Sequence, residues 1–122
     1  MADMQHVTRR RLRRSLVPVA MLLAIGVLVH LGGRGIAAET REVDIDNYTF
    51  TPGDLTVPVG TTVTWVNHDE IPHTVAAADT PRSFKSSGLD TDDKFSFTFA
   101  KPGTYTYLCT VHPYMTGKIV VQ

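Results

Sequence analysis

The chain has 122 residues, which is enough for one domain and leaves little room for a second. Its formal net charge of zero hides two unlike parts: residues 1–38 carry six arginines and one aspartate, whereas residues 39–122 carry six basic and eleven acidic side chains. The acidic second part argues against nucleic-acid binding, and the sequence has no glycine-rich phosphate-binding loop.

Residues 1–38 have the pattern of an export signal. A basic run is followed by an almost wholly apolar stretch from Leu16 to Leu31 and then by small residues. The apolar stretch is shorter than the ~20 residues that a membrane span needs. We therefore expect cleavage after Ala37 or Ala38, with an uncleaved anchor as the alternative.

The arginine-rich run also suggests an export route. Thr8–Arg13 resembles a twin-arginine signal, by which bacteria export proteins already folded around a cofactor. The general secretory route is the alternative. Either route predicts a bacterial periplasmic protein whose mature domain spans residues 39–122.

The mature part has the pattern of short strands separated by turns. Apolar residues alternate with polar ones in four segments, as in half-buried strands: Val43–Ile45, Leu55–Val59, Val63–Trp65 and Phe95–Phe99. Two further strands are expected over Thr104–Leu108 and Lys118–Gln122, and Pro58 indicates a sheet edge or a strand end. Residues 76–93 lack a clean period and predict a loop with at most one short strand or helical turn. The pattern as a whole predicts an all-β sandwich.

The candidate site lies near the end of the chain, where Cys109, His112 and Met115 follow one another at intervals of three residues. Thiolate, imidazole and thioether groups are poor ligands for Mg²⁺ or Ca²⁺ but suit copper that cycles between Cu(I) and Cu(II). His73, directly after Pro72, is the candidate for a second imidazole. Two histidines, one cysteine and a weak axial methionine form the ligand set of a blue-copper electron-transfer site.

Cys109 is the only cysteine in the sequence. In an exported protein a single cysteine has no internal disulfide partner, so its presence calls for another reason. Metal ligation is such a reason, and a buried inert thiol is the alternative.

Three motifs together resemble those of the small type 1 copper proteins, the cupredoxins, and most closely the amicyanin and plastocyanin group. They are the run Cys109–Met115, the pair Trp65–Asn67 with Ile71–His73, and Lys101–Tyr105. The resemblance covers Val43–Gln122 and implies a Greek-key β-sandwich or barrel. It also implies that Cys109 ends a strand, that His112 and Met115 lie on the following loop, and that His73 comes from a second loop at the same end.

The spacing in the ligand loop is more similar to that of amicyanin than to that of azurins, whose loop is longer. Val111 stands where amicyanins often carry proline. We expect this difference to leave the ligands intact and to alter the stiffness of the loop and the reduction potential.

Several neighbours of the ligands are assigned supporting roles. By resemblance to amicyanin, Asn67 is expected to tie the two ligand loops together, and Thr74 and Thr110 are expected to do similar work through hydrogen bonds. Trp65 is interpreted as a core residue. His68 lies among polar residues and is interpreted as a solvated side chain.

The sequence thus predicts a periplasmic type 1 copper protein that carries one electron at a time between redox partners and is no enzyme by itself. The donor and acceptor, from among dehydrogenases, cytochromes, oxidases or reductases, are expected to dock transiently near His112 on a monomeric protein. The expected contact surface is an apolar patch formed by Ile71, Pro72, Pro113 and Tyr114. The acidic groups Asp69–Glu70 and Asp90–Asp93 are interpreted as solvated surface, with docking of a basic partner as the alternative.

Three other functions remain as alternatives. A copper storage or delivery protein without redox turnover would use the same ligands. A thiol hydrolase built on Cys109 and a histidine would give Met115 no role. A zinc site with one cysteine and two histidines is disfavoured because methionine seldom binds zinc.

Overall fold

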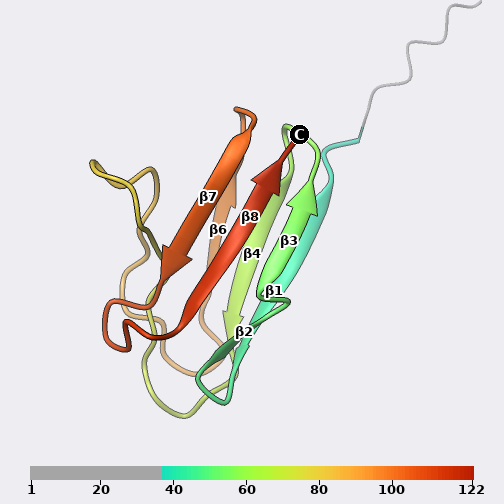
Figure 1. The fold of residues 1–122 in the computed structure, drawn as a ribbon. Coiled ribbons are helices and arrows are strands. Elements are labelled where there is room, and N and C mark those ends of the chain that lie inside the picture. Colours follow the sequence, from blue (N-terminus) through green and yellow to red (C-terminus); the bar gives the residue numbers. More distant parts are fainter. Residues whose placement is uncertain (1–36) are drawn as a thin grey trace, which may run out of the picture. The chain divides into compact units, whose positions relative to one another are not determined.

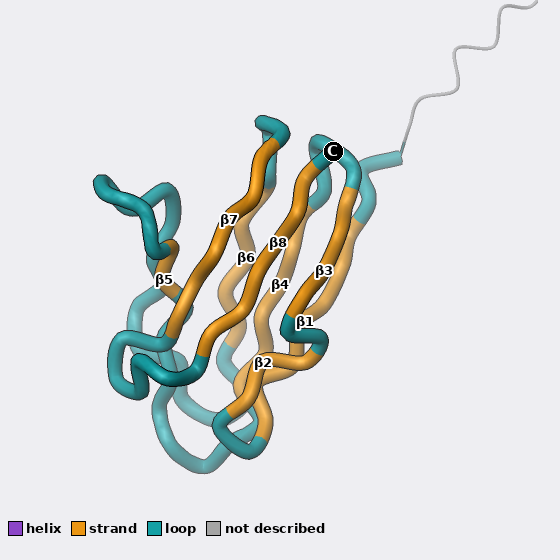
Figure 2. The backbone as a smooth tube through the Cα atoms, in the orientation of Figure 1, coloured by secondary structure: helices purple, strands orange, loops and turns teal. Residues whose placement is uncertain are grey.

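A computed structural model describes residues 37–122, and the predicted signal peptide lies outside this range except for its last two residues. The described chain is built of eight strands (Figures 1 and 2). They are β1 (Thr40–Asp46), β2 (Thr49–Thr51), β3 (Asp54–Val57), β4 (Thr62–Asn67), β5 (Ala76–Ala77), β6 (Lys94–Thr98), β7 (Gly103–Leu108) and β8 (Thr116–Val121).

The strands form two sheets that pack face to face. One sheet has the order β2-β1-β4-β6 and the other has the order β3-β8-β7-β5. The pairs β1–β4 and β3–β8 are parallel, and the other pairs are antiparallel. The chain changes sheet between β2 and β3, at Pro52 and Gly53, so consecutive strands do not all lie side by side. This arrangement confirms the predicted all-β Greek-key sandwich.

Side chains that alternate along the strands fill the space between the sheets. Trp65, Tyr107 and Ile119 are almost fully buried there. The residues on either side of Tyr107 and Ile119 are exposed or half-buried, whereas the end of β4 after Trp65 is buried on both faces. Trp65 stacks on Phe84 with ring centroids 5.7 Å apart and meets Tyr107 edge to face at 5.4 Å. Burial of these large apolar groups is the main force that holds the two sheets together.

The strand predictions agree with the structure except near some turns. β3 ends at Val57, two residues before the predicted end, and lies at a sheet edge as Pro58 indicates. The segment over residues 76–93 contains only the two-residue strand β5. The short strand β2 was not predicted, because only one of its three residues is apolar and buried. β8 begins at Thr116, two residues earlier than predicted.

Three segments from different parts of the chain lie together at one end of the sandwich. Figure 1 shows the β7–β8 loop, the loop after β4 and the β1–β2 turn at the lower end of the view, away from the C-terminus. Within residues 37–122 no helix has the length and apolar character of a membrane span.

Candidate metal centre

Cys109 directly follows β7 and begins the loop that returns the chain into β8. Its side chain is fully buried. Two backbone hydrogen bonds close the loop: the Cys109 N–H donates to the Met115 carbonyl at 3.1 Å, and the Met115 N–H donates to the His112 carbonyl at 2.9 Å. The three residues spaced three apart in the sequence therefore lie on one tight loop.

His73 reaches the same place from the loop after β4. Its N–H donates to the Leu89 carbonyl at 3.1 Å, and the Leu89 N–H donates back to the His73 carbonyl at 2.8 Å. This isolated bridge fixes the backbone of His73 although the residue belongs to no strand. The His73 side chain is fully buried, whereas that of His112 is partly exposed.

Three electron-pair donors converge between the two loops. The Cys109 Sγ atom lies 3.8 Å from Nδ1 of His73 and 3.8 Å from Nδ1 of His112, and the two Nδ1 atoms are 3.2 Å apart. In the described part of the chain, the side chains of His73, Cys109 and His112 form a group whose ligand atoms lie close enough together to hold a metal ion. The structure thus brings together three of the four predicted ligands.

Asp69 determines which nitrogen of His73 carries the proton. Its Oδ2 atom lies 2.7 Å from Nε2 of the imidazole. Because a carboxylate only accepts hydrogen bonds, Nε2 is assigned the proton and Nδ1 keeps its lone pair, which faces the sulfur and the second imidazole. Unprotonated donors so close together repel one another unless a cation lies between them, and nitrogen with thiolate sulfur suits copper. The donor set therefore fits a copper ion.

The surroundings of Cys109 favour its thiolate. The Thr74 N–H donates to Sγ at 3.4 Å. Burial raises the pKa of the thiol, but the Thr74 N–H and the imidazoles of His73 and His112 lower it more, so that the pKa falls from 9.0 to about 6. The metal-binding form of the side chain is thus available at neutral pH.

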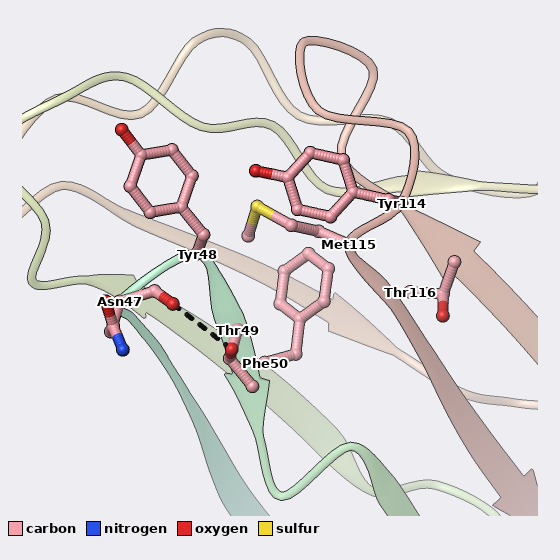
Figure 3. A pocket seen from close by; sticks show the side chains of 7 residues that line it. All are labelled: Asn47, Tyr48, Thr49, Phe50, Tyr114, Met115 and Thr116. Carbon is pink, nitrogen blue, oxygen red and sulfur yellow. Dashed lines mark hydrogen bonds between the residues drawn. The ribbon is translucent and has the colours of Figure 1, made fainter.

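Met115 is buried at the same end of the molecule. Figure 3 shows its side chain among the aromatic rings of Tyr48, Phe50 and Tyr114, which line a pocket with it. Its role as the fourth, axial ligand stays a prediction.

The supporting role of Asn67 differs from the one expected, whereas that of Thr74 and Thr110 agrees. The Asn67 side chain does not bridge the two ligand loops: its Nδ2 donates to the carbonyls of Ile71 and Leu89, and its Oδ1 accepts from the Asp69 N–H. It organises the His73 loop instead. The bridge between the loops is made by Thr74, whose Oγ1 accepts the Thr110 N–H at 2.7 Å.

Asp69 was predicted to be a surface carboxylate and is instead part of the site. Its side chain is only 12 % exposed. Burial raises the pKa of Asp69, but the N–H of Tyr48, the His73 ring and the N–H of Asn47 outweigh this effect and hold the pKa below its ordinary value. The one signal in the sequence was its position four residues before His73. His68 is exposed, as predicted, and pairs with Asp44 at 3.0 Å.

Comparisons with known proteins agree with this geometry. Residues 37–122 match the family of copper binding proteins described as the plastocyanin/azurin family. Amicyanin from Paracoccus denitrificans is 40% identical over 83 residues, a match that covers 66% of this chain and 63% of the amicyanin. This chain therefore spans less than two thirds of that relative's length.

Solved structures show the same relationship. A purple cupredoxin from Nitrosopumilus maritimus is 35% identical with a TM-score of 0.62, and the match covers 66% of this chain and 98% of the cupredoxin. The Cu(I) form of a mutant amicyanin is 36% identical with a TM-score of 0.65, over 72% of this chain and 87% of the amicyanin. The donor set, the cupredoxin sandwich and these matches lead to one conclusion: the chain belongs to the plastocyanin/azurin family of copper binding proteins.

Proposed function

We propose that this protein is a periplasmic one-electron carrier that holds one copper ion through His73, Cys109, His112 and Met115. The observation that carries the proposal is the convergence of two imidazole lone pairs and one thiolate within 4.8 Å of one another. When bound there, copper supplies one-electron chemistry by passing between Cu(I) and Cu(II).

The protein's own groups keep the site rigid. Backbone hydrogen bonds fix both ligand loops at one end of the sandwich. One set joins His73 to Leu89, and the other set closes the Cys109 loop. A ligand geometry that does not rearrange suits both oxidation states and permits fast transfer. One-electron transfer by copper converts no substrate, and we propose that the protein is no enzyme by itself.

The proposed route for the electron runs through His112. Its ring is partly exposed, and the highly exposed Tyr114 ring lies 6.1 Å from it between centroids. Val111 is also exposed on this loop, and so is Pro113. Exposed apolar groups around a partly exposed ligand form a surface on which a redox partner can dock transiently.

Export of the protein belongs to the same proposal. The support is the signal-like pattern of residues 1–38 together with the single thiol, which a copper ion would occupy in an oxidising compartment.

The visible spectrum of the purified protein with added Cu(II) tests the proposal. We expect an intense thiolate-to-copper band that the Cys109→Ala variant lacks, and rapid electron self-exchange of the coloured protein. A colourless product would contradict the copper site. A coloured protein that exchanges electrons slowly and loses copper readily would instead support storage or delivery.

A further inference from the structure

The Asp69 carboxylate holds a strained turn as well as the His73 ring. Its Oδ1 atom accepts the Asn47 N–H at 2.7 Å, and its Oδ2 atom accepts the Tyr48 N–H at 3.0 Å. Asn47 and Tyr48 form the turn between β1 and β2, with φ angles of 47° and 57°. Residues other than glycine rarely adopt this left-handed conformation, so the turn needs support from outside.

The Asn47–Tyr48 turn places an aromatic ring against both imidazoles. The Tyr48 ring centroid lies 5.4 Å from that of His73 and 5.1 Å from that of His112, with interplanar angles of 84° and 82°. Tyr48 is 40% exposed, so its ring covers the site from the solvent side. Figure 3 shows the Tyr48 ring facing the Met115 side chain in the pocket that both residues line.

We propose that Asp69 is a positioning residue that couples the Asn47–Tyr48 turn to the His73 imidazole. One carboxylate then selects the tautomer of one copper ligand and also places the ring that covers two of them. The effect on copper rests on the function proposed above. The contacts by which Asp69 positions the turn and the His73 ring exist without the metal, so they can be tested in the metal-free protein.

An amide at position 69 fails at this task whichever way it is oriented. If its oxygen replaces Oδ2, its NH₂ group faces the Asn47 N–H, and two donors meet. If its oxygen replaces Oδ1, its NH₂ group faces both the Tyr48 N–H and Nε2 of His73. His73 must then accept at Nε2 and carry its proton on Nδ1, where the lone pair for the metal would be.

The test compares the wild-type chain with Asp69→Asn in the metal-free state, by ¹⁵N-resolved NMR of the histidine rings and of Tyr48. We expect His73 to be protonated at Nε2 in the wild type, to populate the Nδ1–H form in the variant, and the Tyr48 ring resonances to shift in parallel. Copper affinity should fall by about 10- to 100-fold.

Asp44→Asn is the matched control, because Asp44 forms a second aspartate–histidine pair, with His68, on the exposed surface of the described domain. This control should leave His73, Tyr48 and copper affinity unchanged. The proposal is overturned if Asp69→Asn leaves both the His73 tautomer and the Tyr48 ring unchanged, if His73 changes while Tyr48 stays in place, or if Asp44→Asn has the same effects.

Should Asp69→Asn fail to fold, the double variant Asn47→Gly/Asp69→Asn provides the same comparison, because glycine adopts the left-handed conformation without strain. Its reference is Asn47→Gly alone, which should keep the wild-type tautomer. The absence of a thiolate band in wild type with Cu(II) would refute the proposed function, whereas the metal-free NMR comparison would still decide the role of Asp69.

Discussion

Thr74 joins the two ligand loops through one hydroxyl group. Its Oγ1 atom accepts the Thr110 N–H at 2.7 Å and lies 2.7 Å from the Thr110 hydroxyl, while the Thr74 N–H faces the Cys109 sulfur. Both loops therefore keep their separation even when no ion draws them together. Such a bridge suits a site that has to keep its geometry when the charge of the metal changes.

Replacement of Thr74 by valine should remove this bridge with little change in the shape of the side chain. The Thr110 N–H then lacks its acceptor, and we expect the free energy of unfolding to fall by about 1–3 kcal/mol in urea denaturation of the metal-free protein. Thr106→Val, at an exposed position on β7, is the control and should have little effect. Equal stability of the two variants would contradict the role of Thr74.

The Cys109 thiol should make the stability of the metal-free protein depend on pH. Its pKa is about 6 in the folded state against 9.0 for the free thiol. Between these values the unfolded chain binds more protons than the folded one, so stability rises with pH by at most about 1.4 kcal/mol per unit. This contribution is complete above about pH 9 and is lost as the pH falls through about 6.

Unfolding titrations at several pH values, repeated on Cys109→Ala, isolate this effect from other groups. The variant should show a smaller increase in stability between pH 6 and 9 than the wild type. Parallel curves for the two proteins would show that the buried thiol is not ionised in the folded state.

At the level of the strands, Gly117 is needed because of the ring opposite it. Gly117 pairs with Tyr107 across β7 and β8, and a Cβ atom on Gly117 would lie 2.3 Å from the Tyr107 ring and hydroxyl. Tyr107 is almost fully buried in the core, so the ring has little room to move away. The absence of a side chain at 117 thus keeps Tyr107 in the core, two residues before Cys109.

Gly117→Ala should therefore destabilise the protein. We expect the overpacking to lower the free energy of unfolding by about 1–3 kcal/mol. Gly88→Ala is the control, since a Cβ atom at Gly88 meets nothing within 4 Å. Thermal unfolding of both variants checks this expectation, and a Gly117→Ala protein as stable as Gly88→Ala would show that the Tyr107 ring moves freely.

At the level of the whole molecule, copper should stabilise the fold. The described domain is small, and its three converging donors come from two loops that unfolding would separate. An ion that binds mainly the folded state stabilises it by about 2.7 kcal/mol when its free concentration is 100 times the Kd. Removal of copper with a chelator should lower Tm, as measured by calorimetry, and Cys109→Ala should not respond to copper in this way.

Electron self-exchange between two copies tests the docking surface without a known partner. Tyr114 and Val59 are both exposed, at 71% and 47%, but Val59 follows β3 at the end of the sandwich away from the ligand loops. Tyr114→Glu should slow self-exchange by roughly tenfold or more, because it puts like charges into the contact of an acidic domain. Val59→Glu should change the rate far less, and equal slowing by both would place the contact elsewhere.

The sequence by itself determined the fold class, the copper site and most of its residues. The strands could be predicted because each buries one face, which produces a period of two in the apolar residues. Cys109, His112 and Met115 could be grouped because they lie within one short loop, where spacing in sequence is close to spacing in space. His73 could be proposed from its place directly after Pro72, but spacing could not group it with the other ligands, because it lies 36 residues before Cys109.

Only the tertiary structure decided which polar residues support the site. Asp69 looks like a surface carboxylate in the sequence, and its partners Asn47 and Tyr48 come from a turn more than 20 residues earlier. Asn67 holds its own loop and does not join the two, so the bridge rests on the Thr74 and Thr110 pair. Hydrogen bonds of this kind form only when the donor and the acceptor on distant segments are placed to within a few tenths of an ångström. That placement is set by the packing of the two sheets and not by any local sequence pattern.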